Sequence, residues 1–474
     1  MTTPAGSTDT QAAAVEASVA RELAPPPELL ARLARARTRL IETVVAAAAR
    51  RGSPLVRAVV AGSAARETFL VDRLDIDLFL LFPADLPDAR LRDEGLALGR
   101  EVLADPTTRY AEHPYLRGTF DAFTVDAVPG FAVADPSRPR SPVDRTPFHQ
   151  AYLAARETPS LVSEIRLAKQ FLRSIGVYGS EARTEGFSGY LTELLVLEFG
   201  SFRGLLRAAR GWTVPARLVP SEREPPRLPD DVALVLTDPV DPHRNVASAL
   251  SRRNLGVFVL SAREYLARPE RAWFEVRLTP PLSRTQALHR VQERASHVTV
   301  VRLGRPDLVD DTLFPQLRKA ERAIAEELAR AGFDVLGSAS GADPHGLIVA
   351  VELTGRLRPA VKARDGPPAG LDRAGDFLAT WPPDRPDVLQ GPYVRSDGRL
   401  AVETREGERE VEAFLRRRLP TLSLGKNLSA GDPEQSVRAL ETADESSALE
   451  EALRSLLAKR LPGPAPAAAR PRST

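Results

Sequence analysis

A small-residue turn followed by a pair of aspartates limits what this chain can fold into more than any other feature. The valine-rich run Leu55–Ala61 predicts a buried strand, and it leads directly into the segment Gly62–Arg66. After eight intervening residues the sequence reads Asp75-Ile-Asp77, at the start of a second apolar run. Because side chains two apart on a strand point to the same face, we expect Asp75 and Asp77 to project together.

The residue types in this arrangement suit a phosphate bound through a metal ion. Gly62 permits close approach of the backbone, Ser63 offers a hydroxyl and an amide, and the start of the following helix attracts anions. Adjacent carboxylates repel unless a cation lies between them, and Mg²⁺ is bound by carboxylates together with substrate phosphates. Asp126, on the predicted strand Thr124–Val128, would complete a three-carboxylate site for two metal ions.

The order of elements predicts a chain of several domains. A length of 474 residues favours about three of them. Strand, helix, strand, helix and more strand predict a small α/β domain ending near residue 150, followed by helical periodicity over 160–211 and a mixed pattern from 297. We therefore expect an α+β multidomain protein, divided as follows: a disordered leader, 1–27; a catalytic domain, 28–150; a central domain, 151–275; a C-terminal body and tail, 276–461; and a disordered tail, 462–474.

Composition excludes several classes of protein. The chain contains no cysteine, which rules out disulfides, thiolate zinc sites and cysteine nucleophiles. No apolar run reaches the roughly 18 to 20 residues that a membrane span requires, so we expect no membrane partner and a cytoplasmic location. The formal charge of +2 neither demands nor excludes nucleic acid. Lysines are rare beside arginine, which favours a specific need for an ammonium group where one persists, as at Lys169.

The turn and the aspartate-bearing strands, taken in order, indicate a protein family more specifically than any one of them alone. An Asp-x-Asp pair alone is typical of many surface strands. Strand, Gly-Ser turn, helix, Asp-x-Asp strand and an Asp-bearing strand, in that order, resemble the catalytic palm domain of the polymerase-beta-like nucleotidyltransferases.

Further blocks narrow the resemblance to the archaeal-type (class I) CCA-adding tRNA nucleotidyltransferases. The blocks include Arg145-Thr-Pro-Phe-His149, Gly186-Phe-Ser-Gly-Tyr-Leu-Thr-Glu-Leu194 and His243-Arg-Asn-Val246. They run from about residue 30 to 335, with a fainter echo at Leu424-Gly-Lys-Asn427, and the resemblance weakens between about 340 and 420.

The resemblance implies a reaction and a set of residues for it. The 3′-hydroxyl of tRNA would attack the α-phosphate of CTP or ATP and release pyrophosphate, with two Mg²⁺ ions bound by Asp75, Asp77 and Asp126. The family often has Glu at the first of these positions, and Asp75 is one methylene shorter. The implied nucleotide-binding residues are Gly62, Ser63, Arg66, Thr146, His149, Lys169, Tyr178 and Arg244. Ser63, Arg66, Lys169 and Tyr178 would contact phosphates, and Arg244 would help to read the base.

Several interpretations stay open at this stage. Tyr178 also fits a packing role, and His113, which matches a position beside the active site, fits a structural hydrogen bond better than a proton shuttle. The resemblance implies that the acceptor stem and T-loop of tRNA lie along the C-terminal domains, and that the protein forms a homodimer. Arginine-bearing stretches at Gln316–Arg330 and Val411–Arg418 could contact phosphates or form charged solvated faces.

Two other functions compete with CCA addition. One is an oligoadenylate-synthetase-like enzyme with another acceptor, which the weaker similarity after residue 340 leaves open. The other is a catalytically idle RNA-binding relative, against which the intact Asp75, Asp77 and Asp126 argue. The Arg145–His149 and His243–Val246 blocks favour CCA addition.

Overall fold

The computed structural model describes residues 5–110, 114–218, 232–277 and 280–464. The chain divides into two compact units. One consists of Met1–Leu278 with Val309–Asp311 and Leu461–Thr474, and the other of Thr279–Leu308 with Thr312–Arg460. The predicted boundary at residue 150 falls inside the first unit and stays a prediction. None of the described helices is both long and apolar enough to cross a membrane.

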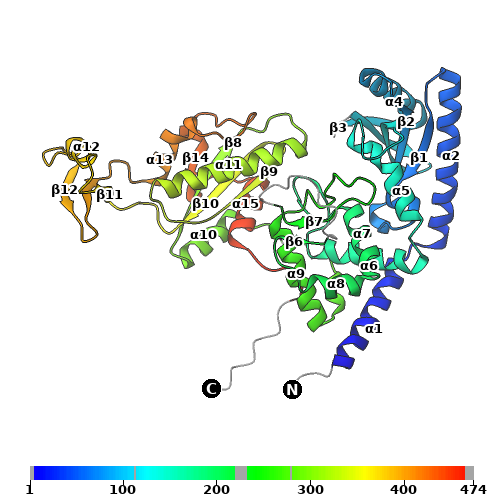
Figure 1. The fold of residues 1–474 in the computed structure, drawn as a ribbon, viewed down its shortest axis with the longest axis horizontal. Helices are drawn as coiled ribbons and strands as arrows, with labels where there is room; N and C mark the ends of the chain where they lie inside the picture. The colour runs from blue at the N-terminus through cyan, green and yellow to red at the C-terminus, as the bar shows by residue number, and fades with distance from the viewer. Residues whose placement is uncertain (1–4, 111–113, 219–231, 278–279, 465–474) are drawn as a thin grey trace. The chain divides into compact units, whose positions relative to one another are not determined.

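The first unit begins with a mixed sheet whose strand order is β1-β2-β5-β4-β3. β2 and β5 run parallel, whereas the other neighbours pair antiparallel. The strands are β1 (Arg57–Ala61), β2 (Asp75–Pro83), β3 (Ala104–Tyr110), β4 (Pro114–Phe120) and β5 (Phe123–Ala132). Helices α2 (Pro27–Arg51) and α4 (Asp88–Val102) share one apolar core with this sheet, and Figure 1 shows α2, in blue, running beside β1 and β2.

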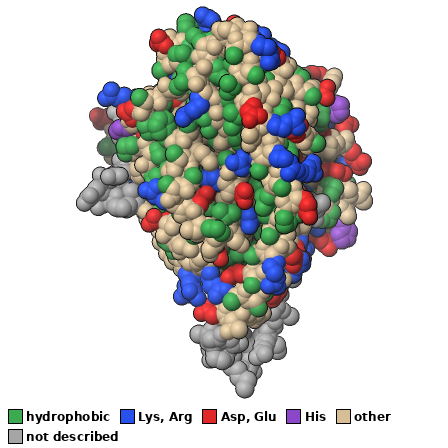
Figure 2. Space-filling model, turned by 90° about the vertical axis from the view of Figure 1, so that its right-hand side faces the viewer, with side chains coloured by type: hydrophobic (Ala, Val, Ile, Leu, Met, Phe, Trp, Pro, Cys, Tyr) green, Lys and Arg blue, Asp and Glu red, His purple; other side chains and the backbone are tan. Residues whose placement is uncertain are grey.

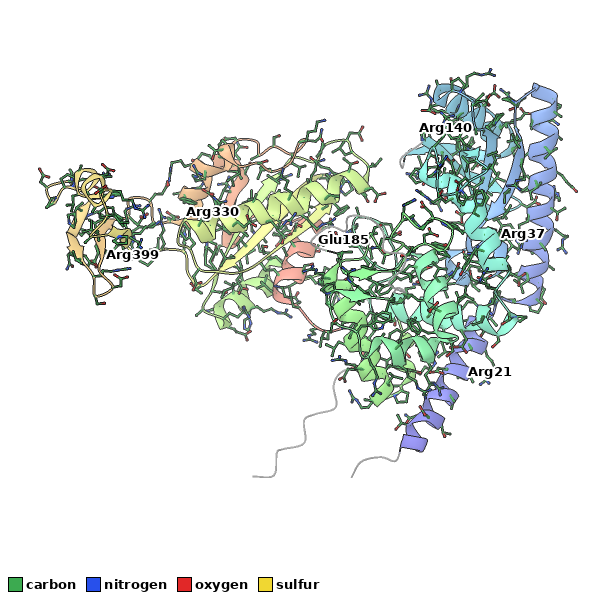
Figure 3. All side chains as sticks on the ribbon, in the orientation of Figure 1. Arg21, Arg37, Arg140, Glu185, Arg330 and Arg399 are labelled. Atoms are coloured by element: carbon green, nitrogen blue, oxygen red, sulfur yellow. The ribbon has the colours of Figure 1, made fainter. Side chains whose placement is uncertain are left out.

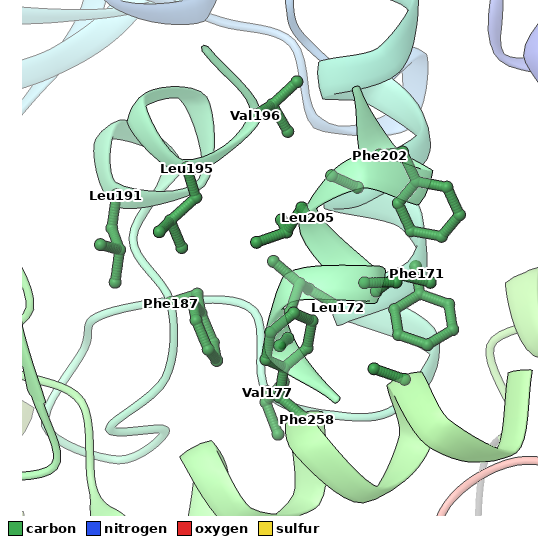
Figure 4. Close-up of a cluster of buried hydrophobic side chains, with 14 of the residues drawn as sticks. Phe171, Leu172, Val177, Phe187, Leu191, Leu195, Val196, Phe202, Leu205 and Phe258 are labelled. Atoms are coloured by element: carbon green, nitrogen blue, oxygen red, sulfur yellow. The ribbon is translucent and has the colours of Figure 1, made fainter. Parts of the chain in front are cut away.

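A helical region follows in the same unit. Its core is rich in aromatic rings, and Figure 4 shows Phe171, Phe187, Phe202 and Phe258 converging from different segments. The elements of this region are α5 (Thr146–Ala154), α6 (Pro159–Ser174), α7 (Gly189–Phe199), α8 (Phe202–Ala209), β6 (Ala216–Arg217), β7 (Leu234–Val235) and α9 (Arg252–Ala267). Serine or threonine side chains cap α6, α7, α8 and α9, which satisfies backbone donors that would otherwise lack partners at the helix starts.

The expectation of a disordered leader over residues 1–27 is wrong for its described part. Ala5–Leu23 forms helix α1, which packs against α6. Ala12 and Val19 are buried, and Glu16 binds Arg203 at 2.5 Å and accepts a hydrogen bond from Tyr265. The low-complexity alanines suggested disorder, but alanine also has the highest helix propensity, and a docking surface on the helical region stabilises the helix. Residues 465–474 of the predicted tail lie outside the described residues.

The second unit contains two separate sheets. The larger has the order β14-β8-β10-β9, and every residue of β10 is buried. The smaller, β11-β13-β12, accounts for the Pro359–Pro392 region. The elements are α10 (Arg284–Glu293), β8 (His297–Leu303), α11 (Asp310–Arg330), β9 (Val335–Asp343), β10 (Gly346–Leu353), β11 (Val361–Pro368), α12 (Ala374–Thr380), β12 (Val388–Val394), β13 (Arg399–Arg405), α13 (Val411–Arg418), α14 (Pro433–Ser436), β14 (Val437–Ala439) and α15 (Ser447–Leu457). α11 begins at Asp310, which clusters with the first unit.

Candidate active site

The strand pairing places the three predicted carboxylates on one face of the first sheet. On β2, Ile76, Leu78, Leu80 and Phe82 are buried in the core beneath α2 and α4, so the alternation of a strand directs Asp75 and Asp77 to the opposite face. Asp77 lies directly across from Asp126 on the parallel neighbour β5. The predicted same-face geometry of the Asp-x-Asp pair is therefore present, with Asp126 beside it.

The turn that follows β1 lies against Asp77. Ala61, the last residue of β1, is the register partner of Asp77. Gly62 has a φ of 70°, and a Cβ at this position would lie 2.0 Å from Oδ2 of Asp77. Only glycine fits this space and this backbone conformation. Ser63 follows as the second residue of the short helix α3 (Gly62–Arg66).

The protein's own cations do not fully neutralise these three carboxylates. Burial, together with Asp126 and Asp75, raises the pKa of Asp77 to about 7, and burial also raises the pKa of Asp126. Oδ1 of Asp126 is buried without a hydrogen-bond partner among the described residues. Arg117 on β4 forms an ion pair with Asp75 and brings its Nε to 3.6 Å from Oδ1 of Asp126.

The donor set fits a divalent cation if one side chain moves. Within the described ranges, no three acidic or histidine side chains already form a metal cage. The guanidinium of Arg117 contacts both Asp75 and Asp126, and its side chain is about one-third exposed. Carboxylate oxygens, one of them unpartnered, are ligands that Mg²⁺ prefers. No sequence pattern singled out Arg117, because its position depends on the register between β4 and β5.

Arg66 and Lys169, predicted to contact phosphates, meet in a buried ionic network. Arg66 pairs with Glu157 and Glu193 and donates a hydrogen bond to Gln150. Nζ of Lys169 donates to Glu193 at 2.6 Å and to two oxygens of Thr68, at 3.0 and 3.1 Å. All three ammonium donors are therefore engaged within the protein.

The acids of this network differ in protonation. Burial alone would raise the pKa of Glu193, but Lys169 and Arg66 lower it to about 2. Burial raises the pKa of Glu157 to about 7, because Arg66 offsets the effect only in part. Sequence reasoning did not single out either residue. The apolar neighbours of Glu193 in helix α7 were a usable signal for it, since acids are rarely buried without a partner.

His149 and Arg244 converge on an aspartate that sequence reasoning did not single out. Asp238 accepts hydrogen bonds from Nε2 of His149 at 2.8 Å and from a guanidinium nitrogen of Arg244 at 2.7 Å. It also accepts from the hydroxyl of Tyr190, whose ring stacks on His149 with centroids 4.0 Å apart. The Asp238 side chain is fully buried, and these partners lower its pKa to about 2 against the effect of burial.

Helix α5 joins the turn region to the Asp238 region. Its residue Gln150 binds Arg66, and the adjacent His149 binds Asp238. Thr146 is the first residue of this helix. Tyr178 packs against the aromatic core, which agrees with a packing role, and burial raises its pKa. His113 lies outside the described residues.

The fold and the carboxylate face define a nucleotidyltransferase of the polymerase-beta-like type. The family model of the nucleotidyltransferase domain matches residues 41–149. Two further models match, "tRNA nucleotidyltransferase, second domain" over 163–275 and "CCA-adding enzyme, C-terminal domain" over 294–434. The last match includes the region after residue 340, where the resemblance based on sequence blocks is weaker.

Relatives identify the particular family. The chain is 40% identical to a CCA-adding enzyme of Halobacterium salinarum, over 89% of this chain and 92% of the relative. It is 44% identical to one of Halorubrum lacusprofundi, over 72% and 76%, and 37% identical to one of Methanosarcina barkeri, over 82% and 85%. The chain belongs to the family of CCA-adding enzymes, which are tRNA nucleotidyltransferases that use nucleotide substrates and divalent metal ions.

Proposed function

We propose that this protein adds or repairs the 3′-terminal CCA of tRNA from CTP and ATP, without a nucleic-acid template. The observation that carries the proposal is the 40% identity to a CCA-adding enzyme over 92% of that relative. The intact carboxylate face supports an active enzyme rather than an idle relative. The match of the C-terminal family model over 294–434 favours tRNA over the acceptor of an oligoadenylate-synthetase-like enzyme.

In the proposed reaction, Asp75, Asp77 and Asp126 hold two Mg²⁺ ions. When bound, such ions lower the pKa of the attacking 3′-hydroxyl and neutralise charge on the triphosphate. Gly62 leaves room for the Asp77 carboxylate at the turn, and Ser63 offers its hydroxyl and amide to a phosphate. Arg66 would have to exchange part of its contact with Glu157 for the triphosphate.

Lys169 takes a different role in this proposal from a direct phosphate contact. Its ammonium is fully engaged by Thr68 and Glu193, so it acts by holding Glu193, which in turn holds Arg66. An ammonium suits this buried point contact better than the wider guanidinium fork.

For the tRNA, we propose a basic group on the second unit as the surface for the acceptor stem and T-loop. Lys319 and Arg322 are exposed on α11 and form no ion pair within the described ranges. Gln316, one turn earlier, exchanges hydrogen bonds with Asn427, which brings the exposed Lys426 beside the same helix. Unpaired cations on one side suit the phosphate backbone of double-stranded RNA.

Other arginines of the predicted basic stretches are engaged by acids. Arg330, labelled in Figure 3, pairs with Glu327 at 2.7 Å, and Arg418 pairs with the same glutamate. Figure 2 looks onto the side of the first unit that carries α2, and it shows basic and acidic side chains interspersed on that face. The proposal therefore rests on the three unpaired cations rather than on the total number of arginines. The implied homodimer stays a prediction, which light scattering can test.

The deciding experiment supplies tRNA that lacks its last one, two or three nucleotides, with labelled CTP or ATP and Mg²⁺. We expect ordered addition of C, C and A by the folded protein. Absence of that order, with Asp77→Ala as the inactive control, would refute the function. Lys319→Ala combined with Arg322→Ala should raise the KM for tRNA and leave the KM for CTP unchanged.

A further inference from the structure

We propose that Asp238 is a positioning residue that sets the hydrogen-bond pattern by which one site accepts cytosine and adenine and rejects uracil and guanine. The inference rests on the proposed function and adds a specificity determinant to it. It concerns how His149 and Arg244 are presented to a base.

Side chains from three segments converge on Asp238. His149 comes from α5, Tyr190 from α7, and Arg244 from the segment after β7, and all three side chains donate to the one carboxylate of Asp238. The carboxylate also accepts a hydrogen bond from the backbone N–H of Val240 at 3.1 Å. A buried acceptor with four donors leaves little rotational freedom to any of them.

Asp238 determines which ring nitrogen of His149 carries the hydrogen. An ionised carboxylate can only accept hydrogen bonds, so Nε2 of His149 carries its hydrogen toward Asp238. In the neutral imidazole, Nδ1 is then left as an acceptor. The stacked ring of Tyr190 holds the plane of the imidazole, with an interplanar angle of 28°.

Asp238 also holds one end of the Arg244 guanidinium. One terminal nitrogen of its guanidinium is bound to Asp238, which leaves other N–H donors of the planar fork available. The side chain is about one-third exposed, in contrast to the fully buried Asp238. Asp238 therefore presents one acceptor, on His149, and at least one donor, on Arg244.

This pair matches what cytosine and adenine share. Each has an exocyclic amine that donates and a neighbouring ring nitrogen that accepts, whereas uracil and guanine have a carbonyl oxygen and a ring N–H at these positions. A site that reads this shared edge can take a pyrimidine and a purine without measuring their size. Rejection is strong because the wrong base leaves polar groups unpaired.

A matched control lies three residues along the same loop. Asp241 is also buried, and it binds Arg145 at 2.7 Å and the backbone N–H of His243. It anchors the same loop to the residue before α5 but contacts neither His149 nor Arg244 through its side chain. Loss of Asp241 thus reports the effect of loosening the loop alone.

The test compares kcat/KM for correct and incorrect nucleotides in the full-length protein. The assays use CTP and UTP with tRNA lacking all of CCA, and ATP and GTP with tRNA lacking only A. In Asp238→Asn, the amide can donate to Nε2 of His149, which turns Nδ1 into a donor. We expect both discrimination ratios to fall by roughly 10- to 100-fold, and to stay within about threefold of wild type in Asp241→Asn.

Several outcomes would overturn the proposal. One is a folded Asp238→Asn protein whose activity falls equally for correct and incorrect nucleotides. If that variant fails to fold, His149→Phe decides, because the phenyl ring can keep the stacking on Tyr190 while the Nδ1 acceptor is lost. Wild-type discrimination in His149→Phe would contradict the inference. Failure of the wild-type protein to add C, C and A would instead refute the proposed function, so the two failures are distinguishable.

Discussion

The first unit contains partly buried and fully buried carboxylates, and burial acts on the pKa of both kinds in the same direction. Asp77 and Asp126 have raised pKa values, with that of Asp77 at about 7. Glu193 and Asp238 are at least as buried, yet their pKa values are lowered to about 2. The difference is the supply of cations and hydrogen-bond donors, because Lys169 and Arg66 surround Glu193 whereas Oδ1 of Asp126 has no hydrogen-bond partner among the described residues.

We infer from this contrast which acids stabilise the fold and which would bind a cation. A carboxylate that the protein itself neutralises contributes to stability, and its removal leaves buried cations unpaired. A carboxylate without enough positive charge is destabilising until a cation arrives. Variants at the two kinds of site should therefore have opposite effects on stability and activity, which makes the comparison testable.

The largest effect is expected from Asp77→Asn. Loss of a metal ligand should lower kcat for CTP addition by more than about 100-fold, since even groups that only support metal ligands cost about 10- to 100-fold. The unfolding midpoint at pH 8 should stay equal or rise, because a buried and poorly compensated charge is removed. Activity near wild type in single-turnover assays would refute the metal assignment.

Glu193→Gln should have the opposite signature. We expect a loss of about 3–5 kcal/mol in the free energy of unfolding, because Lys169 and Arg66 stay buried without their anion. Urea denaturation measures this loss. Glu198→Gln, at an exposed position on the same helix α7, is the matched control and should change stability by less than about 0.5 kcal/mol.

The lowered pKa of Glu193 predicts how the stability of the folded protein depends on pH. The folded pKa of Glu193, about 2, lies below its ordinary value of 4.5. Its contribution is therefore complete above pH 4.5 and is lost as pH falls toward 2. Acid unfolding of wild type between these values should be steeper than that of Glu193→Gln, and equal slopes would contradict the ionic network.

For Asp77 we expect a dependence of stability on pH that is opposite in sign to that of Glu193 and smaller in size. Its folded pKa of about 7 lies above the ordinary value of 3.8, so the folded state loses stability as pH rises from 3.8 through 7. Mg²⁺ should restore it at pH 8, raising the midpoint of thermal unfolding by ~2–4 °C at about ten times its dissociation constant. At pH 5 the shift should be smaller, and Asp77→Asn should remove most of the difference.

The smallest effect is expected from Arg117→Ala. Its guanidinium occupies the space between Asp75 and Asp126, so Mg²⁺ must displace it. The variant should bind Mg²⁺ several-fold more tightly in calorimetric titration. This change corresponds to the loss of about 1 kcal/mol of competition from Arg117. Weaker binding would mean that Arg117 supports the metal ligands instead of competing for them.

Residues close in sequence were the easiest to predict. The Gly62 turn and the same-face pair Asp75 and Asp77 follow from local rules, strand alternation and glycine geometry, which act within a few residues. Asp126 needed only the assumption that its strand adjoins β2. The helix α1 was missed because alanine-rich composition does not show whether a docking surface such as that around Arg203 and Tyr265 exists.

The amino-acid sequence by itself determined which residues form the candidate site, a strand face with carboxylates beside a Gly-Ser turn, and the resemblance pointed to the family. Only the tertiary structure decided how charge is distributed among these groups. Whether Lys169 is free or bound to Glu193, and whether His149 turns toward Asp238, depends on residues far apart in the chain. Electrostatic energies follow from distance and burial in three dimensions, and strand or helix periodicity carries no information about either across such separations.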